Sequence, residues 1–223
     1  MSFALTVSAV KHSAFRRAAP ALAAASIAAL FTPASARAQG AMTLPLEART
    51  KGVATAPITV YEMADFQCPY CGSFARETFG TLETEFIKTG KVRWIFINLP
   101  IPSIHANAIA AAEFGVCAAL QGKFWAAHDM LYASQAQWEK LKNPVPFFHS
   151  KIASLALKDG EMTECLQSGR ASAMLKDDIA GAQKSGVEST PSFYIEGGIM
   201  AGAQPVAVFR RILDSIYRVK TKK

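Results

Sequence analysis

The sequence predicts an α/β fold that is interrupted by a long helical segment, and three observations lead to this prediction. Residues 58–99 show a strand, a helix and a second strand in succession, which is the βαβ unit of a parallel sheet. Residues 103–185 are rich in Ala, Leu, Gln and Lys and follow a helical spacing without evident strands. Residues 191–218 return to strand patterns and finish with a helix.

The βαβ unit begins with a strand at residues 58–65, where Ile58 and Val60 share one face by the two-residue period. A helix is expected over residues 74–88, followed by a glycine that is typical of helix ends. Residues 92–99 (VRWIFINL) are rich in β-branched and aromatic side chains and therefore predict the second strand.

The helical segment is expected to contain three helices. Their apolar positions are Ile109, Val116 and Leu120 in the first, Phe124, Trp125, His128 and Leu131 in the second, and Met162, Cys165 and Leu166 in the third. Histidines in this segment are expected on helix surfaces or in caps. After it, residues 191–195 predict a strand and residues 199–201 its partner. Pro205 opens a last helix that runs through Arg218.

The N-terminal region has the layout of a secretory signal peptide over residues 1–38. Basic residues precede an apolar run at residues 18–31, and Ala36-Arg37-Ala38 predicts cleavage after Ala38. The run has 14 residues, whereas spanning a bilayer takes about 20. An uncleaved anchor and a buried helix are the alternatives. Arg16-Arg17 is compatible with twin-arginine export, and the general secretory route fits equally well.

Three segments follow the signal peptide in the predicted organisation. Residues 39–102 form the first part of the α/β domain, residues 103–185 the helical insertion, and residues 186–223 the second part of the α/β domain. The signal peptide holds four basic residues and no acidic one, so the mature chain has 20 basic and 17 acidic residues, a net charge of +3. Nucleic-acid binding is not expected, because it needs Lys and Arg clustered on one face.

The four residues Cys68-Pro69-Tyr70-Cys71 carry the main chemical signal. Cysteines three apart in the first turn of a helix lie close enough to form a disulfide. The free N–H groups and the helix dipole favour negative charge on the first sulfur, so its pKa falls and the reactive thiolate forms. Pro69 suits a first-turn position. We therefore expect Cys68 to be the exposed, reacting sulfur and Cys71 the buried one.

Such a pair of cysteines has two other common uses. A zinc site would need two further Cys or His ligands, but His105, His128 and His149 are scattered and the other two cysteines form no second close pair. No metal is therefore expected. A purely structural disulfide is also disfavoured, because a four-residue loop removes little chain entropy.

Glu62 and Thr190-Pro191 join the candidate site. Glu62 lies six residues before Cys68, on the strand face that carries Val60. A carboxylate on an apolar strand face is costly, so its functional interpretation is a proton carrier for Cys71. A solvent-facing acid at the strand edge is the alternative. Thr190-Pro191 precedes a strand, and an X-Pro bond there can be cis and expose backbone groups that pair with a substrate peptide.

Three motifs, in this order and spacing, resemble the DsbA family of bacterial thiol–disulfide oxidoreductases: DFQCPYC at residues 65–71, QGKFW at residues 121–125 and GVESTPSF at residues 186–193. The resemblance covers about residues 52–218. It implies a thioredoxin-like fold with an inserted helical domain and a cis-proline at Pro191 that faces the active site. It also implies that Glu62 is the acid buried behind the cysteines. No cofactor is expected.

The resemblance further implies a function in the periplasm, where disulfides would be introduced into reduced or misfolded exported proteins. A membrane quinone-linked reoxidase of the DsbB type is the expected partner. Strong oxidants of the family carry Pro-His where this chain has Pro69-Tyr70, and Tyr70 brings no cation to the thiolate. The chain lacks a long N-terminal stalk, so a monomer is expected. The alternatives are a disulfide isomerase or reductase, or a copper- or zinc-binding stress protein that uses the same thiols.

Cys117 and Cys165 form the second pair. Members of the resembled family can carry a disulfide between the corresponding helices, and an exported protein permits one. Such a bond would close a loop of about 48 residues, which the chain-entropy model values at roughly 4 kcal/mol. Two free buried cysteines acting as small apolar side chains are the alternative.

Overall fold

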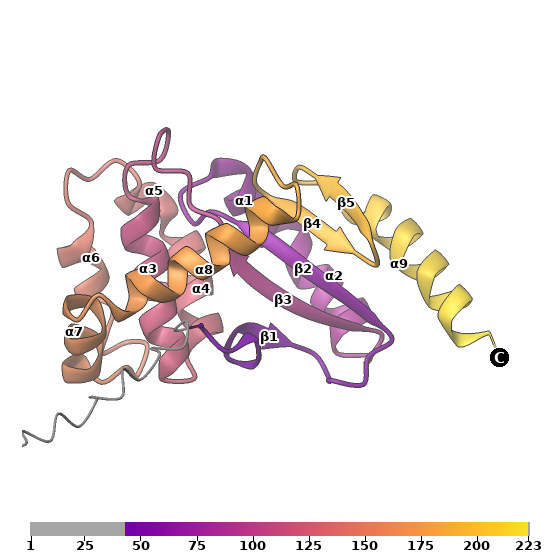
Figure 1. Ribbon diagram of the computed structural model, residues 1–223, viewed down its shortest axis with the longest axis horizontal. Helices are drawn as coiled ribbons and strands as arrows, with labels where there is room; N and C mark the ends of the chain where they lie inside the picture. The colour runs from indigo at the N-terminus through magenta and orange to yellow at the C-terminus, as the bar shows by residue number, and fades with distance from the viewer. Residues whose placement is uncertain (1–42, 223) are drawn as a thin grey trace, which may run out of the picture. The chain divides into compact units, whose positions relative to one another are not determined.

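The computed structural model describes residues 43–222 (Figure 1). The signal peptide predicted for residues 1–38, with its cleavage after Ala38, lies outside the described residues. Among residues 43–222, no helix has both the length and the apolar character that crossing a membrane requires.

A five-stranded sheet with the order β1-β3-β2-β4-β5 forms the centre of the α/β part (Figure 1). Its strands are β1 (Thr50–Lys51), β2 (Ile58–Ala64), β3 (Val92–Asn98), β4 (Ser192–Ile195) and β5 (Gly198–Ala201). β2 pairs in parallel with β3 and antiparallel with β4, so strands from both ends of the chain flank it. The four predicted strands are confirmed, and the two-residue β1 was not predicted.

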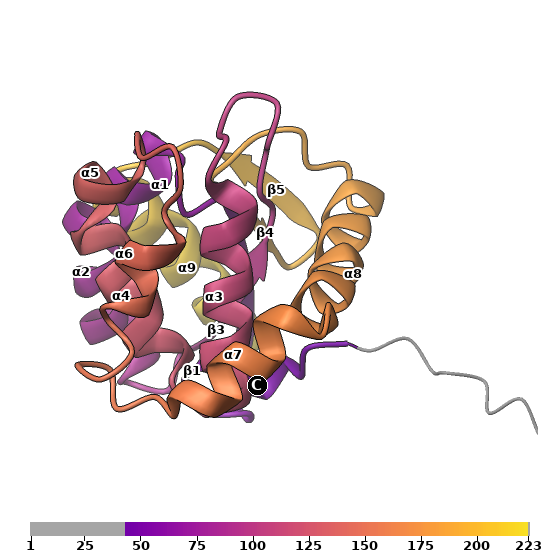
Figure 2. The same cartoon turned by 90° about the vertical axis from the view of Figure 1, so that its left-hand side faces the viewer.

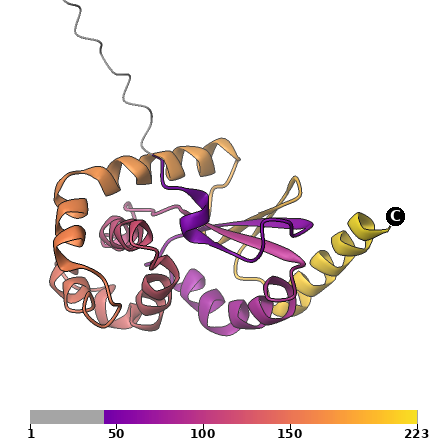
Figure 3. The same cartoon turned by 90° about the horizontal axis from the view of Figure 1, so that it is seen from below.

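Helices cover both faces of this sheet (Figure 3). A continuous helical run from Pro69 to Ile87 packs on one face, and in it α1 (Pro69–Phe74) and α2 (Gly80–Leu82) alternate with two π-helical stretches. The last helix, α9 (Val206–Thr221), packs on the same face through Phe209 and Leu213. The other face is covered by α8 (Arg170–Lys184), whose Ile179 and Ala182 pack with Met63 and Leu99.

The remaining helices lie between β3 and β4 in the chain. They are α3 (Ala108–Leu120), α4 (Phe124–Ala133), α5 (Gln135–Trp138), α6 (Val145–His149) and α7 (Asp159–Gln167). α3 contacts α4, α6, α7 and α8 and is therefore the centre of this group (Figure 2). The expected helices at α3, α4 and α7 are confirmed, whereas α5, α6 and α8 were not predicted.

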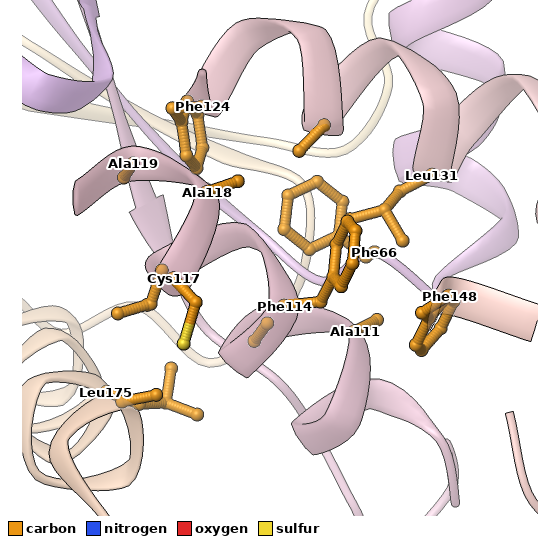
Figure 4. Packing of buried hydrophobic residues seen from close by; sticks show 14 of the residues in the cluster. Phe66, Ala111, Phe114, Cys117, Ala118, Ala119, Phe124, Leu131, Phe148 and Leu175 are labelled. Atoms are coloured by element: carbon orange, nitrogen blue, oxygen red, sulfur yellow. The ribbon is translucent and has the colours of Figure 1, made fainter. Parts of the chain in front are cut away.

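Two large apolar cores support these layers. One lies between the sheet and the helices of its first face, around Phe74, Trp94 and Phe193. The other fills the helical segment, where Phe66 meets Phe114, Phe124 and Leu131 (Figure 4). This second core includes Cys68 and Cys71. The turn that carries the cysteines is therefore packed against the helical segment as well as against its own sheet.

Two polar side chains, those of His128 and Arg49, are buried inside the fold. His128 is 2 % exposed, so its expected surface position is wrong; it lies among aromatic rings, with the centroids of Trp125 and Tyr132 each 4.9 Å from its own. Burial lowers its pKa. Arg49, in the 3-10 turn Leu46–Arg49, forms a buried ion pair with Asp178 of α8. Asp178 also accepts hydrogen bonds from the backbone and side chain of Asn98.

Candidate active site

The first turn of α1 carries both free cysteines. β2 leads into a short turn, and Cys68 is the N-cap of the helix with Pro69 at its first position. Proline loses nothing there, because the N–H at that position has no partner in the helix. The backbone N–H groups of Tyr70 and Cys71 donate toward the sulfur of Cys68. The helix start therefore presents donors to this sulfur, as the spacing of the cysteines predicts.

The two thiols have pKa values shifted in opposite directions. The pKa of Cys68 falls from 9.0 to about 6, first because the thiol of Cys71 donates a hydrogen bond to it, with further help from Thr190 and the helix N–H groups. The pKa of Cys71 rises well above 9.0, first because of burial and then because of its neighbour's charge. At neutral pH Cys68 is thus a thiolate, and Cys71 keeps its proton.

The exposure of Cys68 differs from the prediction. Cys68 is 4 % exposed and Cys71 is 0 % exposed. Both cysteines are therefore buried, and the prediction that Cys68 is exposed is wrong. The loop before β4 covers Cys68: its Sγ lies 3.4 Å from the carbonyl oxygen of Thr190. The Thr190–Pro191 bond in this loop is cis. The structure thus brings Thr190 and Pro191 to the cysteines.

Glu62 lies behind the pair on β2 and is 1 % exposed, so it is not a solvent-facing acid. Its Oε2 accepts a hydrogen bond of 2.8 Å from Trp94 Nε1, and its Oε1 has no hydrogen-bond partner among the described residues. Burial raises the pKa of Glu62 from 4.5 to about 7, and its charge contributes to the raised pKa of Cys71. A carboxyl group with this pKa can take up or release a proton at neutral pH.

A polar network holds the turn between β2 and Cys68. Asp65 is buried and accepts hydrogen bonds from the backbone N–H groups of Gln67 and Ile101, at 2.8 and 2.9 Å. His105 Nδ1 lies 2.7 Å from the same carboxylate. Gln135, in α5, donates to backbone carbonyls of the turn. Sequence reasoning gave no such role to Asp65 or Gln135, because their distant partners lie 36 to 69 residues away along the chain.

The remaining predicted residues take separate places. Tyr70 is 68 % exposed, so its ring stands in solvent beside the pair. Cys117 and Cys165 are joined by a disulfide between α3 and α7, with 5.8 Å between their Cα atoms. Within residues 43–222, no group of three or more Cys, His, Asp or Glu side chains is arranged to hold a metal ion. The site that the structure assembles therefore consists of Cys68, Cys71, Glu62 and the loop at Thr190.

Comparisons with known proteins agree with this geometry. Residues 46–215 match the family model described as Thioredoxin. The chain is 33 % identical over 160 residues to the Na(+)/H(+) antiporter NhaA 1 of Salinispora arenicola, which covers 72 % of this chain and 23 % of that protein. It is 28 % identical over 146 residues to the probable disulfide bond formation protein D of Bacillus anthracis, covering 64 % of this chain and 66 % of that protein.

A solved structure shares the fold. The crystal structure of α-DsbA1 from Wolbachia pipientis superimposes with a TM-score of 0.68 at 22 % identity, covering 77 % of this chain and 92 % of that one. The expected thioredoxin-like fold with DsbA-type architecture is thereby confirmed. The chain spans less than a quarter of the antiporter that it matches. The activities of these relatives therefore inform the function of this chain only through the residues of its site.

Proposed function

Because the chain belongs to the thioredoxin family, we propose that it is a thiol–disulfide oxidoreductase that introduces disulfide bonds into exported proteins through Cys68 and Cys71. One observation carries this proposal: two free cysteines share the first turn of α1, and their pKa values are shifted in opposite directions. A stabilised thiolate on Cys68 favours the reduced pair, and a pair that is stable when reduced is an oxidant toward other thiols.

The reaction takes two exchange steps. In the oxidised protein a disulfide joins Cys68 to Cys71, and a substrate thiolate attacks Cys68 Sγ. The new mixed disulfide expels Cys71 as a thiolate. Because the pKa of Cys71 is high, this sulfur takes up a proton, and Glu62 is proposed as the acid that supplies it. A second substrate thiolate then attacks the substrate's own sulfur, so the substrate leaves as a disulfide and Cys68 leaves as a thiolate.

Substrate binding is assigned to the exposed surface around the pair. Tyr70 and Ile104 are 68 % and 71 % exposed, which offers apolar contact to unfolded chains. A cleft of about 470 Å³, lined by α8 and by the loops after β3 and before β4, lies outside the site and includes Pro102, Gln183 and Val187. The backbone at Thr190 can pair with an extended peptide as an added strand would. Reduced or misfolded exported proteins are the proposed substrates.

The expected setting follows from the same chemistry. Net oxidation of thiols needs an oxidising compartment, which supports the periplasm and the signal peptide predicted over residues 1–38. Each cycle leaves the pair reduced, so a partner must remove two electrons, and a membrane quinone-linked reoxidase of the DsbB type is proposed for this step. The protein is proposed to act as a monomer without a cofactor.

Replacement of Cys68 tests the proposal. Cys68→Ala should abolish the oxidation of a reduced, unfolded test protein, because no mixed disulfide can form. Cys71→Ala should also lose oxidation, because it cannot form the Cys68–Cys71 disulfide. Its Cys68 thiolate should still attack the bond of a disulfide-containing test peptide, and mass spectrometry detects the mixed disulfide that results. Cys117→Ala with Cys165→Ala is the matched control, since it removes two cysteines outside the site and should leave oxidation measurable. Oxidation by Cys68→Ala at the unmodified rate would refute the assignment.

The reduction potential of the Cys68–Cys71 pair decides the direction of electron flow. Equilibration with glutathione should give a potential well above that of thioredoxin, which is about −270 mV. A potential at or below that of thioredoxin would favour the reductase alternative.

A further inference from the structure

The backbone carbonyl groups just before α1 accept hydrogen bonds from the helical segment. Gln135 Nε2 donates to the carbonyl oxygens of Phe66 and Cys68, at 2.8 and 3.0 Å. Tyr132, at the end of α4, places its hydroxyl 3.4 Å from the carbonyl oxygen of Asp65. Donors that lie far along the chain therefore fix the turn that carries the reacting sulfur.

The Gln135 side chain makes three hydrogen bonds, through its amide nitrogen and its oxygen. It is 5 % exposed, its amide nitrogen serves two acceptors, and its Oε1 lies 3.4 Å from an Nη1 donor of Arg76. The opposite orientation of the amide would set its oxygen against two carbonyl oxygens. Only a neutral amide with its nitrogen toward the turn satisfies this site.

Gly72 provides a second and independent observation. It lies inside α1, where glycine costs about 1 kcal/mol relative to alanine. A Cβ atom at this position would lie 2.3 Å from Gln135 Oε1 and 2.7 Å from Arg76 Nη1. The missing side chain leaves room for the amide of Gln135.

We propose that Gln135 is a positioning residue for Cys68, which holds the start of α1 in the orientation that stabilises the thiolate. The proposal rests on the redox role assigned above to Cys68. It also gives the helical segment a part in the chemistry, because the residue that orients the nucleophile comes from outside the α/β part of the chain.

The physical link runs through one peptide group. The carbonyl oxygen of Cys68 accepts from Gln135 and also from the backbone N–H of Gly72, at 3.0 Å, which is the first hydrogen bond of α1. The N–H groups of Tyr70 and Cys71 that stabilise the thiolate belong to the same turn. If the amide is removed, the peptide planes before the helix can rotate, and the donors no longer converge on the sulfur.

The test compares Gln135→Ala and Gln135→Met with Gln137→Ala. Methionine keeps the length and neutrality of glutamine but has no donor, and Gln137 is an exposed residue of the same helix. The pKa of Cys68 is measured in the reduced proteins from thiolate absorbance, and the equilibrium constant with glutathione is measured separately. In both Gln135 variants we expect the pKa to rise by about one unit and the pair to become about tenfold less oxidising, which is about 30 mV.

A double-mutant cycle that combines Gly72→Ala with Gln135→Ala tests the close approach of these two residues. In the wild-type background Gly72→Ala should raise the pKa of Cys68, because the added methyl group displaces the amide of Gln135. In the Gln135→Ala background it should have little further effect. Equal shifts in the two backgrounds would contradict the link between Gly72 and Gln135.

The proposal would be overturned if, in both Gln135 variants, the acid dissociation constant of Cys68 and the equilibrium constant with glutathione lie within twofold of those of Gln137→Ala. This holds whatever happens to the melting temperatures of the variants. Failure of all the Gln135 and Gly72 variants to fold, beside a folded Gln137→Ala, would also overturn it in favour of a purely structural role. The thiol titration uses no substrate. A protein that fails to oxidise other proteins would thus count against the proposed function and leave this test intact.

Discussion

At the scale of single residues, two chemically identical thiols behave differently because of their partners. Cys68 receives hydrogen bonds at a helix start, whereas Cys71 is enclosed and faces the negative charge of its neighbour. Glu62 adds a third titrating group, buried with one carboxylate oxygen unpartnered among the described residues. Cys68 and Cys71 affect each other's pKa directly, and the charge of Glu62 contributes to the raised pKa of Cys71.

Glu62→Gln should stabilise the reduced protein at alkaline pH. Glu62 has a pKa of about 7 in the folded protein, raised from 4.5, so folding favours its neutral form. Its contribution to the free energy of unfolding is complete below pH 4.5 and is lost as the pH rises to about 7. Glutamine does not titrate. The free energy of unfolding of the variant, relative to wild type, should therefore increase by about 3 kcal/mol between pH 4.5 and pH 8. Urea unfolding at both pH values measures this difference.

Glu77→Gln is the matched control for this substitution, because Glu77 is exposed on the same helical run as the cysteines. The change that Glu62→Gln produces between the two pH values should clearly exceed the change that Glu77→Gln produces. A Glu62→Gln difference that stays constant from pH 4.5 to pH 8 would contradict the raised pKa.

The sequence predicts the members of the site better than their surroundings. Cys68 and Cys71 follow from spacing, and Glu62 from the two-residue period of β2. The burial of Cys68 does not follow, because the covering carbonyl of Thr190 comes 122 residues later. Gln135 carries no local signal either. Gly72 precedes the helix predicted over residues 74–88, so the room that it leaves for Gln135 was not predicted either.

At the scale of elements, α8 shows where periodicity misleads. Its buried positions include Ala171, Met174, Leu175 and Ala182, but Asp178 occupies the same face. Because Asp178 interrupts the apolar face, a search for regularly spaced apolar residues does not predict this helix. Its partner, Arg49, precedes it by 129 residues, so the neutralisation of the charge is visible only in the folded protein. Helices whose burial depends on distant ion pairs escape such a search in general.

Removal of the disulfide between α3 and α7 should destabilise the fold. Cys117 and Cys165 are 48 residues apart in sequence, and the chain-entropy model gives about 4 kcal/mol for a loop of this length. We expect the double variant Cys117→Ala with Cys165→Ala to lose roughly that free energy of unfolding, measured with urea in the absence of reductant.

Alkylation of the protein purified without reductant provides the corresponding check on the Cys117–Cys165 bond. Neither Cys117 nor Cys165 should be modified. Free thiols at both positions, or a loss of less than about 1 kcal/mol in the double variant, would contradict a stabilising disulfide.

At the scale of the whole molecule, the redox state of one helical turn is coupled to the stability of the fold. Cys68 titrates only in the reduced protein, with a folded pKa of about 6 against 9.0 for the ordinary thiol. A lowered pKa contributes stability that is full above pH 9 and is lost as the pH falls to 6. The reduced protein should therefore gain stability over the oxidised protein between pH 6 and pH 9, by roughly 1 kcal/mol at pH 7.

Paired thermal or urea unfolding of the two redox forms at several pH values measures this gain. Glu62 is present in both forms, so its opposite dependence largely cancels in the difference. Cys68→Ser forms neither the thiolate nor the Cys68–Cys71 disulfide, so its stability should follow the pH dependence of the oxidised protein. A difference between the redox forms that does not change from pH 6 to pH 8 would contradict the lowered pKa.

The position of β4 in the sheet has a consequence for the order in which the protein is assembled. β4 is the strand that pairs with β2 on the side opposite β3, and the loop before it covers Cys68. A ribosome delivers residues 58–71 long before residues 190–195. It follows that the nascent chain carries its two reactive cysteines uncovered until most of its residues have been made, while Cys117 and Cys165 emerge in the meantime. The loop before β4 is therefore the last part of the site to be made.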